Sequence, residues 1–187
     1  QRAIFLDRDG TINKYLGFLR NINDFELLPG AAEAIRQINL SGFLAIVVTN
    51  QPVVARGEVT FAELQEIHNK METLLGQEGA FIDKIYFCPH HPHKGYTGEV
   101  TELKIDCECR KPKIGMLLKA AKDFNIDLSK SIVIGDSTSD IKMAKDAGCT
   151  AVLVKTGEKG QDGKYDVVPD IIANDLLDAV NILFKNY

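Results

Sequence analysis

Two aspartates, Asp7 and Asp9, come directly after the apolar run Ile4-Phe5-Leu6 and flank a single arginine. Such a run is typical of a buried strand, and residues two positions apart on an extended chain point to the same side. At the carboxyl end of a strand in an open α/β sheet, both carboxylates would face the crevice in which ligands usually bind. One could attack as a nucleophile and the other could transfer a proton, and together they offer the oxygen ligands that Mg²⁺ prefers. Two acids at a strand end are also common as solvated surface, so the assignment depends on the rest of the chain.

Polar side chains also follow two other apolar runs. The run 43–48 is followed by Thr49-Asn50-Gln51, and the run 131–135 is followed by Asp136, with Asp140 four residues further on. Because the carboxyl ends of parallel strands meet at one edge of a sheet, these groups would join the two aspartates there. Carboxylates, a hydroxyl and amides are groups that a phosphoryl-transfer site requires. We therefore expect one chemical site built from three strand ends.

The hydrophobic periodicity predicts the elements that must position these groups. Strands that alternate with helices indicate an α/β fold with a central parallel sheet covered on both faces, which is a three-layer sandwich. The length of 187 residues fits a single domain, 1–187, and the glycine-rich tract 156–165 is expected to be a mobile surface loop. Strands are expected near 4–6, 43–48, 82–87, 131–135 and 150–154, and helices near 31–41, 60–76, 114–124, 141–147 and 175–184.

Composition and charge narrow the class of protein. With 45% hydrophobic and 26% charged residues, the chain is typical of a soluble globular protein. A net charge of −4 at pH 7 argues against a nucleic-acid partner held by bulk electrostatics. No apolar run approaches the roughly 20 residues of a membrane span and no signal-peptide pattern opens the chain, so we expect a cytoplasmic protein with no membrane partner. A monomer is a separate expectation. Because the chain begins at Gln1 rather than Met, the sequence leaves open whether a further domain precedes it.

The segment 88–112 is rich in His, Gly, Cys and charge and is too long for an ordinary loop, so it should have a function or its own cross-link. It contains two close pairs, Cys88 with His90 and Cys107 with Cys109. Three thiolates and one imidazole match a closed, four-ligand zinc site of the structural kind, with no open position for water. We therefore predict a loop over 88–109 that is stapled by Zn²⁺, in preference to buried reduced cysteines.

The remaining histidines and the fourth cysteine have less specific surroundings. His91 and His93 compete with His90 as the imidazole ligand, and we expect them to be exposed loop residues. Cys149 stands beside a glycine before an apolar run and is expected to be a small core residue. His68 lies within an amphipathic helix, where we expect a surface position without a function.

Taken in chain order, these stretches resemble the haloacid dehalogenase (HAD) superfamily of phosphotransferases. Each motif alone is weak, but four occur in order and each follows the right kind of element. The resemblance implies that Asp7 forms an aspartyl-phosphate and that Asp9 acts first as an acid and then as a base. Thr49 and Lys111 would hold the oxygens of the transferred phosphoryl group. The motifs are Asp7-Arg8-Asp9-Gly10-Thr11, the strand-terminal Thr49, Lys111, and Gly135-Asp136 with Asp140.

The same resemblance implies a catalytic Mg²⁺ held by Asp7, by Asp136 and by the backbone carbonyl of Asp9. The cation would offset the repulsion between a carboxylate and an approaching phosphate. The resemblance leaves two alternatives for Asp140. It could support the metal ligands through a weak contact, or it could be a helix residue that faces the site. The supporting position is favoured.

The zinc loop joined directly to Cys109-Arg110-Lys111-Pro112 is similar to one group of the superfamily, which lacks a separate cap domain. This group contains histidinol-phosphate phosphatases and D-glycero-D-manno-heptose 1,7-bisphosphate phosphatases, and the heptose enzymes match best. The resemblance implies removal of the 7-phosphate of a phosphorylated sugar, on the path to the nucleotide-activated heptose of lipopolysaccharide or other surface glycans. It also implies that the sugar site is lined by Arg110, by Asn50 and Gln51, and by the loop Tyr15-Leu16-Gly17-Phe18.

The chain departs from the pattern of the heptose enzymes at three places. The stretch 52–57 differs in sequence, and the stretch 94–106 is longer than a minimal zinc loop. Ser137 stands where some members have a Lys that contacts substrate. Histidinol-phosphate phosphatase and the phosphatase domain of a fused sugar-nucleotide enzyme therefore stay as alternatives. A receiver-like signalling domain or a metal-binding interaction module is a different class. Asp9 argues against that class, because an acid or base two residues beyond the nucleophile serves hydrolysis.

Overall fold

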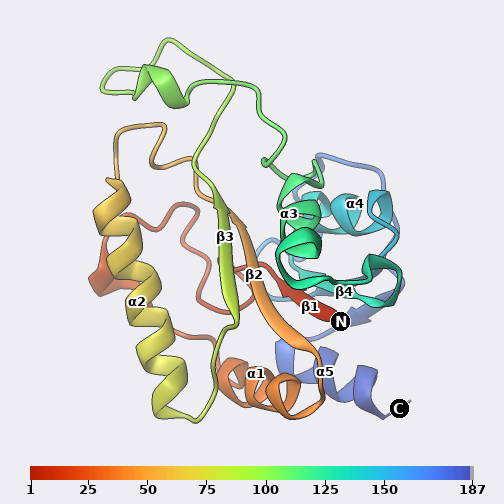
Figure 1. Ribbon diagram of the computed structural model, residues 1–187. Helices are drawn as coiled ribbons and strands as arrows, with labels where there is room; N and C mark the ends of the chain where they lie inside the picture. The colour runs from red at the N-terminus through yellow and green to blue at the C-terminus, as the bar shows by residue number, and fades with distance from the viewer. Residues whose placement is uncertain (186–187) are drawn as a thin grey trace.

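The structure is a computed structural model that describes residues 1–185, and a six-stranded sheet lies at its centre (Figure 1). The strand order is β3-β2-β1-β4-β5-β6, and every neighbouring pair is parallel. The apolar, β-branched composition of the inner strands suits strands that are covered on both faces. The strands are β1 (Ala3–Leu6), β2 (Leu44–Asn50), β3 (Lys84–Cys88), β4 (Ile132–Gly135), β5 (Thr150–Val154) and β6 (Ile171–Ala173).

Helices cover both faces of this sheet, and alternate residues of β1 show how the core divides. Ile4 and Leu6 belong to the apolar cluster that includes residues of α1, α2 and α5. Phe5, between them, belongs to the cluster on the other face with residues of α3 and α4, as the two-residue period of a strand requires. The helices are α1 (Ala31–Leu40), α2 (Phe61–Gln77), α3 (Gly115–Phe124), α4 (Thr138–Asp146) and α5 (Leu176–Phe184).

The predicted α/β architecture is confirmed, and some of its details differ, apart from shifts of one or two residues at strand ends. Helix α4 begins at Thr138 rather than near 141, because Ser137 and Asp140 form a capping box that starts the helix earlier. Strand β6 has no counterpart in the prediction, because three residues are too few for a periodicity signal.

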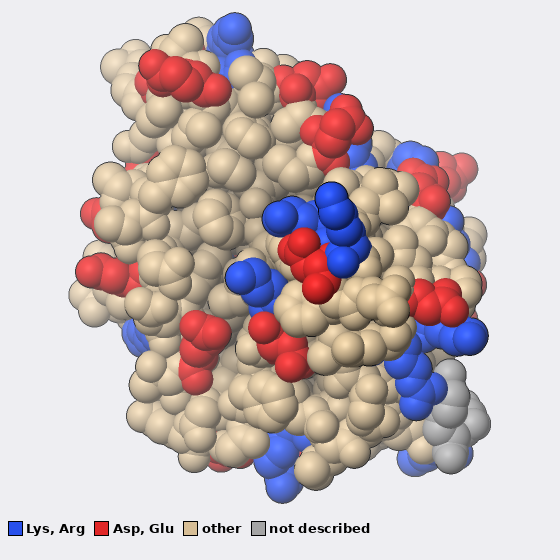
Figure 2. All heavy atoms as spheres, in the orientation of Figure 1, with Lys and Arg blue, Asp and Glu red and all other residues tan. Residues whose placement is uncertain are grey.

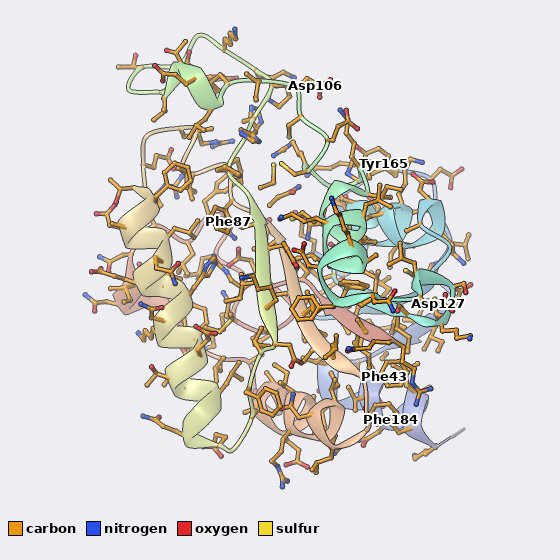
Figure 3. The ribbon with its side chains drawn as sticks, in the orientation of Figure 1. Phe43, Phe87, Asp106, Asp127, Tyr165 and Phe184 are labelled. Atoms are coloured by element: carbon orange, nitrogen blue, oxygen red, sulfur yellow. The ribbon has the colours of Figure 1, made fainter. Side chains whose placement is uncertain are left out.

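Because all the strands are parallel, their carboxyl ends meet at one edge of the sheet, which is where the chain places its polar loops. Phe43 and Phe184 mark the opposite edge, where their ring centroids lie 6.1 Å apart (Figure 3). On the face drawn in Figure 2, acidic and basic side chains are interspersed rather than gathered by sign. None of the helices within residues 1–185 has the length and apolar character needed to cross a bilayer.

Candidate active site

The turn after β1 presents Asp7 at the edge of the sheet. The Asp7 N–H extends the strand pairing by donating to the carbonyl of Ile134 at 3.0 Å, and the residue as a whole is 8% exposed. The chain then folds back, and the carbonyl of Arg8 accepts the Ile12 N–H at 2.8 Å. Gly10 adopts a φ of +86°, and a Cβ there would lie 2.3 Å from Asp136 Oδ2. Only glycine therefore allows this turn to approach Asp136 so closely.

Lys111 is buried between two carboxylates. Its Nζ donates to Asp7 Oδ1 at 2.8 Å, to Asp140 Oδ1 at 2.7 Å and to the carbonyl of Val48 at 3.0 Å. Burial alone would lower the pKa of Lys111, but the charges of Asp140 and Asp7 raise it above its ordinary value. The amine is therefore a fixed positive charge beside Asp7.

Asp140 holds this lysine and the start of α4 at the same time. Its Oδ2 accepts the Ser137 N–H at 3.1 Å and the Ser137 hydroxyl at 2.8 Å, while its Oδ1 accepts from Lys111. The side chain is fully buried, and both of its oxygens already have donors. Asp140 therefore supports Lys111 and Ser137 from a position on α4 beside Asp7 and Asp136.

Asp9 accepts hydrogen bonds from three side chains. Arg8 donates to both carboxylate oxygens at 2.9 Å, Asn13 Nδ2 donates to Oδ1 at 2.9 Å and Gln51 Nε2 donates to Oδ2 at 2.8 Å. Burial would raise the pKa of Asp9, but the charge of Arg8 and these donors hold it below its usual range. Asp9 is thus an ionised, oriented carboxylate two residues from Asp7.

The expectation that His68 lies at the surface is wrong. His68 is 2% exposed, and its Nε2 lies 3.2 Å from Nη1 of the fully buried Arg8. Arginine has no acceptor, so the imidazole Nε2 accepts and the ring is neutral. Burial and the charge of Arg8 lower the pKa of His68 to about 3. The signal was its spacing, since His68 follows the buried Leu64 by four residues on α2.

The tract 156–165, expected to be a surface loop, packs onto the site. The Glu158 N–H donates to Asp136 Oδ2 at 2.7 Å, and the Thr156 hydroxyl donates to the carbonyl of Gly10 at 2.6 Å. A Cβ at Gly157 would lie 2.0 Å from Asp136 Oδ2, so glycine is what lets this backbone reach the carboxylate. The glycines that suggested a free loop instead allow close docking.

Asp7, Asp136 and Asp140 form a group whose carboxylate oxygens lie within 4.8 Å of one another. Burial, then repulsion from the neighbouring carboxylates, raises the pKa of Asp136 to about 9 and that of Asp7 to about 6. Carboxylates crowded in this way suit a divalent cation, which needs oxygen ligands and neutralises their charge. Since Asp140 is already occupied by Lys111 and Ser137, Asp7 and Asp136 are the better candidates to hold one.

A cavity of about 400 Å³ opens over Asp7, Asp9 and Asp136. Of the residues predicted to contact a sugar, Leu16 is not among those that line the cavity, and this residue is 51% exposed. Asn50 lines it but is committed to the next loop, because its side chain exchanges hydrogen bonds with the backbone of Lys111 at 3.0 and 3.2 Å. The other predicted lining residues are present: Tyr15, Gly17, Phe18, Gln51 and Arg110.

Several further residues of the cavity wall have no place in the predicted site, and four of them add charge or hydrogen-bonding groups. Arg56 and Lys164 add positive charge, and Glu158 accepts a hydrogen bond from the Tyr15 hydroxyl at 2.8 Å. His91, expected to be exposed, is partly buried in the wall. These positions are far apart in the sequence, so only the folded chain brings them to one cavity.

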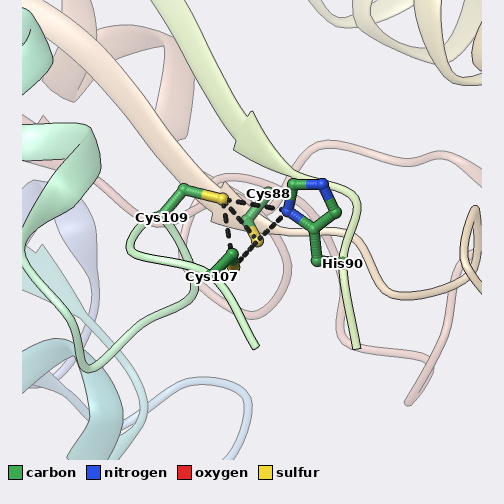
Figure 4. A group of neighbouring side chains, drawn as sticks. All are labelled: Cys88, His90, Cys107 and Cys109. Atoms are coloured by element: carbon green, nitrogen blue, oxygen red, sulfur yellow. Dashed lines mark hydrogen bonds between the residues drawn. The ribbon is translucent and has the colours of Figure 1, made fainter. Parts of the chain in front are cut away.

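The predicted zinc ligands converge at the end of β3 (Figure 4). The Sγ atom of Cys88 lies 3.5 Å from that of Cys107 and 2.9 Å from that of Cys109. His90 directs Nδ1 to the same point, 3.3 Å from the Cys109 Sγ. Three thiol sulfurs and one imidazole around a single point form the donor set of a structural Zn²⁺ site. Cys149 lies apart in the core, 5% exposed, as expected.

Comparison with known proteins agrees with this geometry. A family model described as HAD-hydrolase-like matches residues 108–179. The chain is 41% identical over 184 residues to D-glycero-beta-D-manno-heptose-1,7-bisphosphate 7-phosphatase of Escherichia coli strain K12, covering 98% of this chain and 94% of that protein. It is 38% identical over 189 residues to D-glycero-D-manno-heptose-1,7-bisphosphate 7-phosphatase of Thermosynechococcus vestitus, covering 95% and 93%.

Among solved structures, the fold is similar to D,D-heptose 1,7-bisphosphate phosphatase from B. bronchiseptica complexed with magnesium and phosphate. The TM-score is 0.85, the sequence identity is 32%, and the match covers 100% of both chains. A HAD-like phosphatase from Mesorhizobium loti matches with a TM-score of 0.81 and 32% identity, over 97% of this chain and 87% of that chain.

Proposed function

Since this chain belongs to the HAD-like hydrolase family that includes the heptose-1,7-bisphosphate 7-phosphatases, we propose that it is a Mg²⁺-dependent phosphatase. Its proposed substrate is D-glycero-D-manno-heptose 1,7-bisphosphate, from which it removes the 7-phosphate. The observation that carries the proposal is the buried Asp7, 2.8 Å from a charged Lys111 and two residues before a second oriented carboxylate. A nucleophile, a fixed positive charge and an acid/base group are the parts that phosphoryl transfer to a carboxylate requires.

In the proposed first step, an oxygen of Asp7 attacks the phosphorus, and the bond from phosphorus to the sugar O7 breaks. Lys111 and the Arg8 N–H both donate to Asp7 Oδ1 at 2.8 Å, which fixes the rotation of the carboxylate before attack. Lys111 and Thr49 then hold the phosphoryl oxygens. The Thr49 Oγ1 accepts from Gln51 Nε2 at 2.9 Å, so the hydroxyl hydrogen is available to a phosphoryl oxygen.

Asp9 is the proposed acid and then the base. A phosphate dianion that enters the cavity raises the pKa of Asp9 by repulsion, which favours its protonated form and proton transfer to the leaving O7. Once the sugar leaves, the ionised Asp9 takes a proton from water, which attacks the aspartyl-phosphate and releases inorganic phosphate. Gln51 and Asn13 keep the carboxylate in place through both steps.

The residues present fit a Mg²⁺ ion at Asp7 and Asp136, together with the backbone carbonyl of Asp9. Their raised pKa values reflect a surplus of negative charge in a buried space, which a divalent cation relieves. When bound there, Mg²⁺ neutralises the charge that accumulates between the carboxylate and the phosphate.

The proposed Zn²⁺ has a structural role at Cys88, His90, Cys107 and Cys109. Cys109 directly precedes Arg110 and Lys111, so a metal at this point fixes the segment that carries both cations. The side chain of Asn50 secures the other side of the segment through the backbone of Lys111. No ligand position remains open for catalysis at such a four-ligand site.

The basic side chains of the cavity wall favour a substrate with a second phosphate over histidinol phosphate. Arg56, Arg110 and Lys164 line the wall, and they would repel the cationic amine of histidinol phosphate. A second phosphate would instead find cations that can hold it.

The experiment that tests this proposal is phosphate release with Mg²⁺ from a small panel of substrates. The panel contains both anomers of heptose 1,7-bisphosphate, histidinol phosphate, simple sugar monophosphates and p-nitrophenyl phosphate. We expect a strong preference for one heptose anomer. Activity confined to histidinol phosphate would agree with the proposed reaction but show that the proposed substrate is wrong. No phosphate release from any compound would show that the protein is not a phosphatase.

A further inference from the structure

His68 is a buried polar side chain that the proposed reaction does not use. It is 2% exposed on α2, the helix that lies beside β3 in Figure 1. Its ring packs against Phe87 of β3, with the ring centroids 5.8 Å apart, and Phe87 is in register with Thr49 of β2. Phe61 of α2 lies against the same Phe87 ring, 6.3 Å between centroids. These contacts hold the imidazole between α2 and the strand next to Thr49.

His68 contacts the guanidinium group that holds Asp9. Nη1 of Arg8 lies 3.2 Å from His68 Nε2, while Nη2 donates to both carboxylate oxygens of Asp9 at 2.9 Å. The third nitrogen, Nε, is buried and has no hydrogen-bond partner within residues 1–185. In the described part of the chain, the guanidinium is therefore anchored at two points, by Asp9 at one nitrogen and by His68 at another.

A neutral hydrogen-bond acceptor is the kind of partner that Arg8 requires at this position. The guanidinium offers only donors, so Nε2 accepts and the imidazole is uncharged. A carboxylate in its place would compete with Asp9 for the charge of Arg8, and a cation would repel that charge. The imidazole instead satisfies one buried N–H and leaves the ion pair between Arg8 and Asp9 intact. His68 thus fixes the direction of the guanidinium without weakening its hold on Asp9.

We propose that His68 is a positioning residue for the proton transfers of Asp9 and that it acts through the Arg8 guanidinium. The inference rests on the proposed function, because it needs Asp9 to be the acid and base of a phosphatase. His68 does not line the catalytic cavity, so it touches no reacting atom. Without its acceptor, two nitrogens of the buried Arg8 would lack partners, and the guanidinium would turn to satisfy them. Asp9 would move with it, and proton transfer depends steeply on the position of the acid.

The test compares two substrates, phenyl phosphate and p-nitrophenyl phosphate, which differ only in a nitro group. The p-nitrophenolate ion leaves without a proton, whereas phenolate is a poorer leaving group and depends more on the acid. For each substrate we consider kcat/KM, which includes the steps up to the first cleavage of the bond to phosphorus. The ratio of kcat/KM for phenyl phosphate to that for p-nitrophenyl phosphate therefore reports acid catalysis. Losses of folded protein or of phosphate binding affect both substrates and cancel in this ratio.

We expect His68→Leu to lower this ratio about tenfold, which is less than the loss for Asp9→Asn, because the acid is displaced rather than removed. His68→Gln keeps an acceptor oxygen for Arg8, so its ratio should stay near that of the wild type. Leu75→Ala is the matched control. Leu75 is a fully buried apolar residue about two turns further along α2, and its truncation should lower stability but leave the ratio unchanged.

A double variant shows whether the effect passes through Asp9. In the Asp9→Asn enzyme, His68→Leu should lower the ratio no further, because the acid through which it acts is already absent. A further tenfold loss in that enzyme would overturn the inference. An unchanged ratio in His68→Leu, or an equal loss in His68→Leu and His68→Gln, would overturn it as well. A wild-type enzyme that releases phosphate neither from these two compounds nor from sugar phosphates would refute the proposed function instead, before any variant is compared.

Discussion

The buried His68 should make the folded protein less stable below neutral pH. In the folded chain the pKa of His68 is lowered to about 3, from an ordinary value of 6.5, by burial and by the charge of Arg8. Because the unfolded chain binds a proton that the folded chain does not, His68 contributes stability above pH 6.5. That contribution is lost as the pH falls from 6.5 toward about 3.

The size of the effect follows from this shift. At pH 5 the solution is about 1.5 pH units below the pKa of the unfolded histidine, which is therefore protonated, while the folded histidine is still neutral. At about 1.4 kcal/mol per unit, His68 makes the free energy of unfolding about 2 kcal/mol lower at pH 5 than at pH 7. This is a large part of the roughly 5–15 kcal/mol that stabilises a domain of ordinary size.

The assay is urea unfolding of the wild-type protein and of a His68→Gln variant, each at pH 7 and at pH 5. Glutamine keeps an acceptor oxygen for the Arg8 guanidinium but does not titrate. Other groups, including Asp7 and Asp136 with their raised pKa values, titrate in both proteins and cancel in the comparison. We expect the wild type to lose about 2 kcal/mol more than the variant between the two pH values. An equal loss in both would refute the view that a neutral His68 supports Arg8.

Other predictions concern the ionic core and the metal sites. Lys111→Met leaves Asp7 and Asp140 facing each other without a cation, so it should abolish turnover. It should also lower the free energy of unfolding, measured in urea without Mg²⁺, by about 3–5 kcal/mol. Unchanged stability would contradict the arrangement. Cys107→Ser should reduce bound Zn²⁺ well below one per chain by elemental analysis, and full occupancy would show that the ligand set is wrong. Asp9→Asn should lower turnover of a sugar phosphate by at least about a hundredfold while the circular dichroism stays unchanged, and near-normal turnover would exclude Asp9 as acid and base.

The carboxylates at the carboxyl ends of β1 and β4 were predictable because the local sequence determines their positions. An apolar run predicts a buried strand, and the residues after it must stand at the sheet edge, so Asp7 and Asp136 needed no knowledge of distant contacts. The zinc cluster is similar, since the spacing of Cys107 and Cys109 itself brings two donors together. In such cases the chemistry and the position are encoded in the same few residues.

The contacts that could not be predicted join segments that lie far apart in the chain. Arg8 and His68 meet across 60 positions, and their pairing depends on how α2 packs on the sheet. The tract 156–165 carries the composition of a free loop, yet Gly157 brings it against Asp136. His91 lines the cavity, and its N–H donates to the carbonyl of Leu103, twelve positions further along the chain, at 3.2 Å.

The most direct test of the account is to trap the phosphorylated carboxylate. The Asp9→Asn enzyme is mixed with Mg²⁺ and p-nitrophenyl phosphate, whose good leaving group needs no general acid, and is then quenched and reduced with borohydride. Trypsin cleavage after Arg2 and Arg8 releases a peptide that contains Asp7 but not residue 9. The account predicts reduction of Asp7 to homoserine only when substrate and Mg²⁺ are both present. An unmodified Asp7 under conditions of turnover, or reduction at another carboxylate, would contradict it.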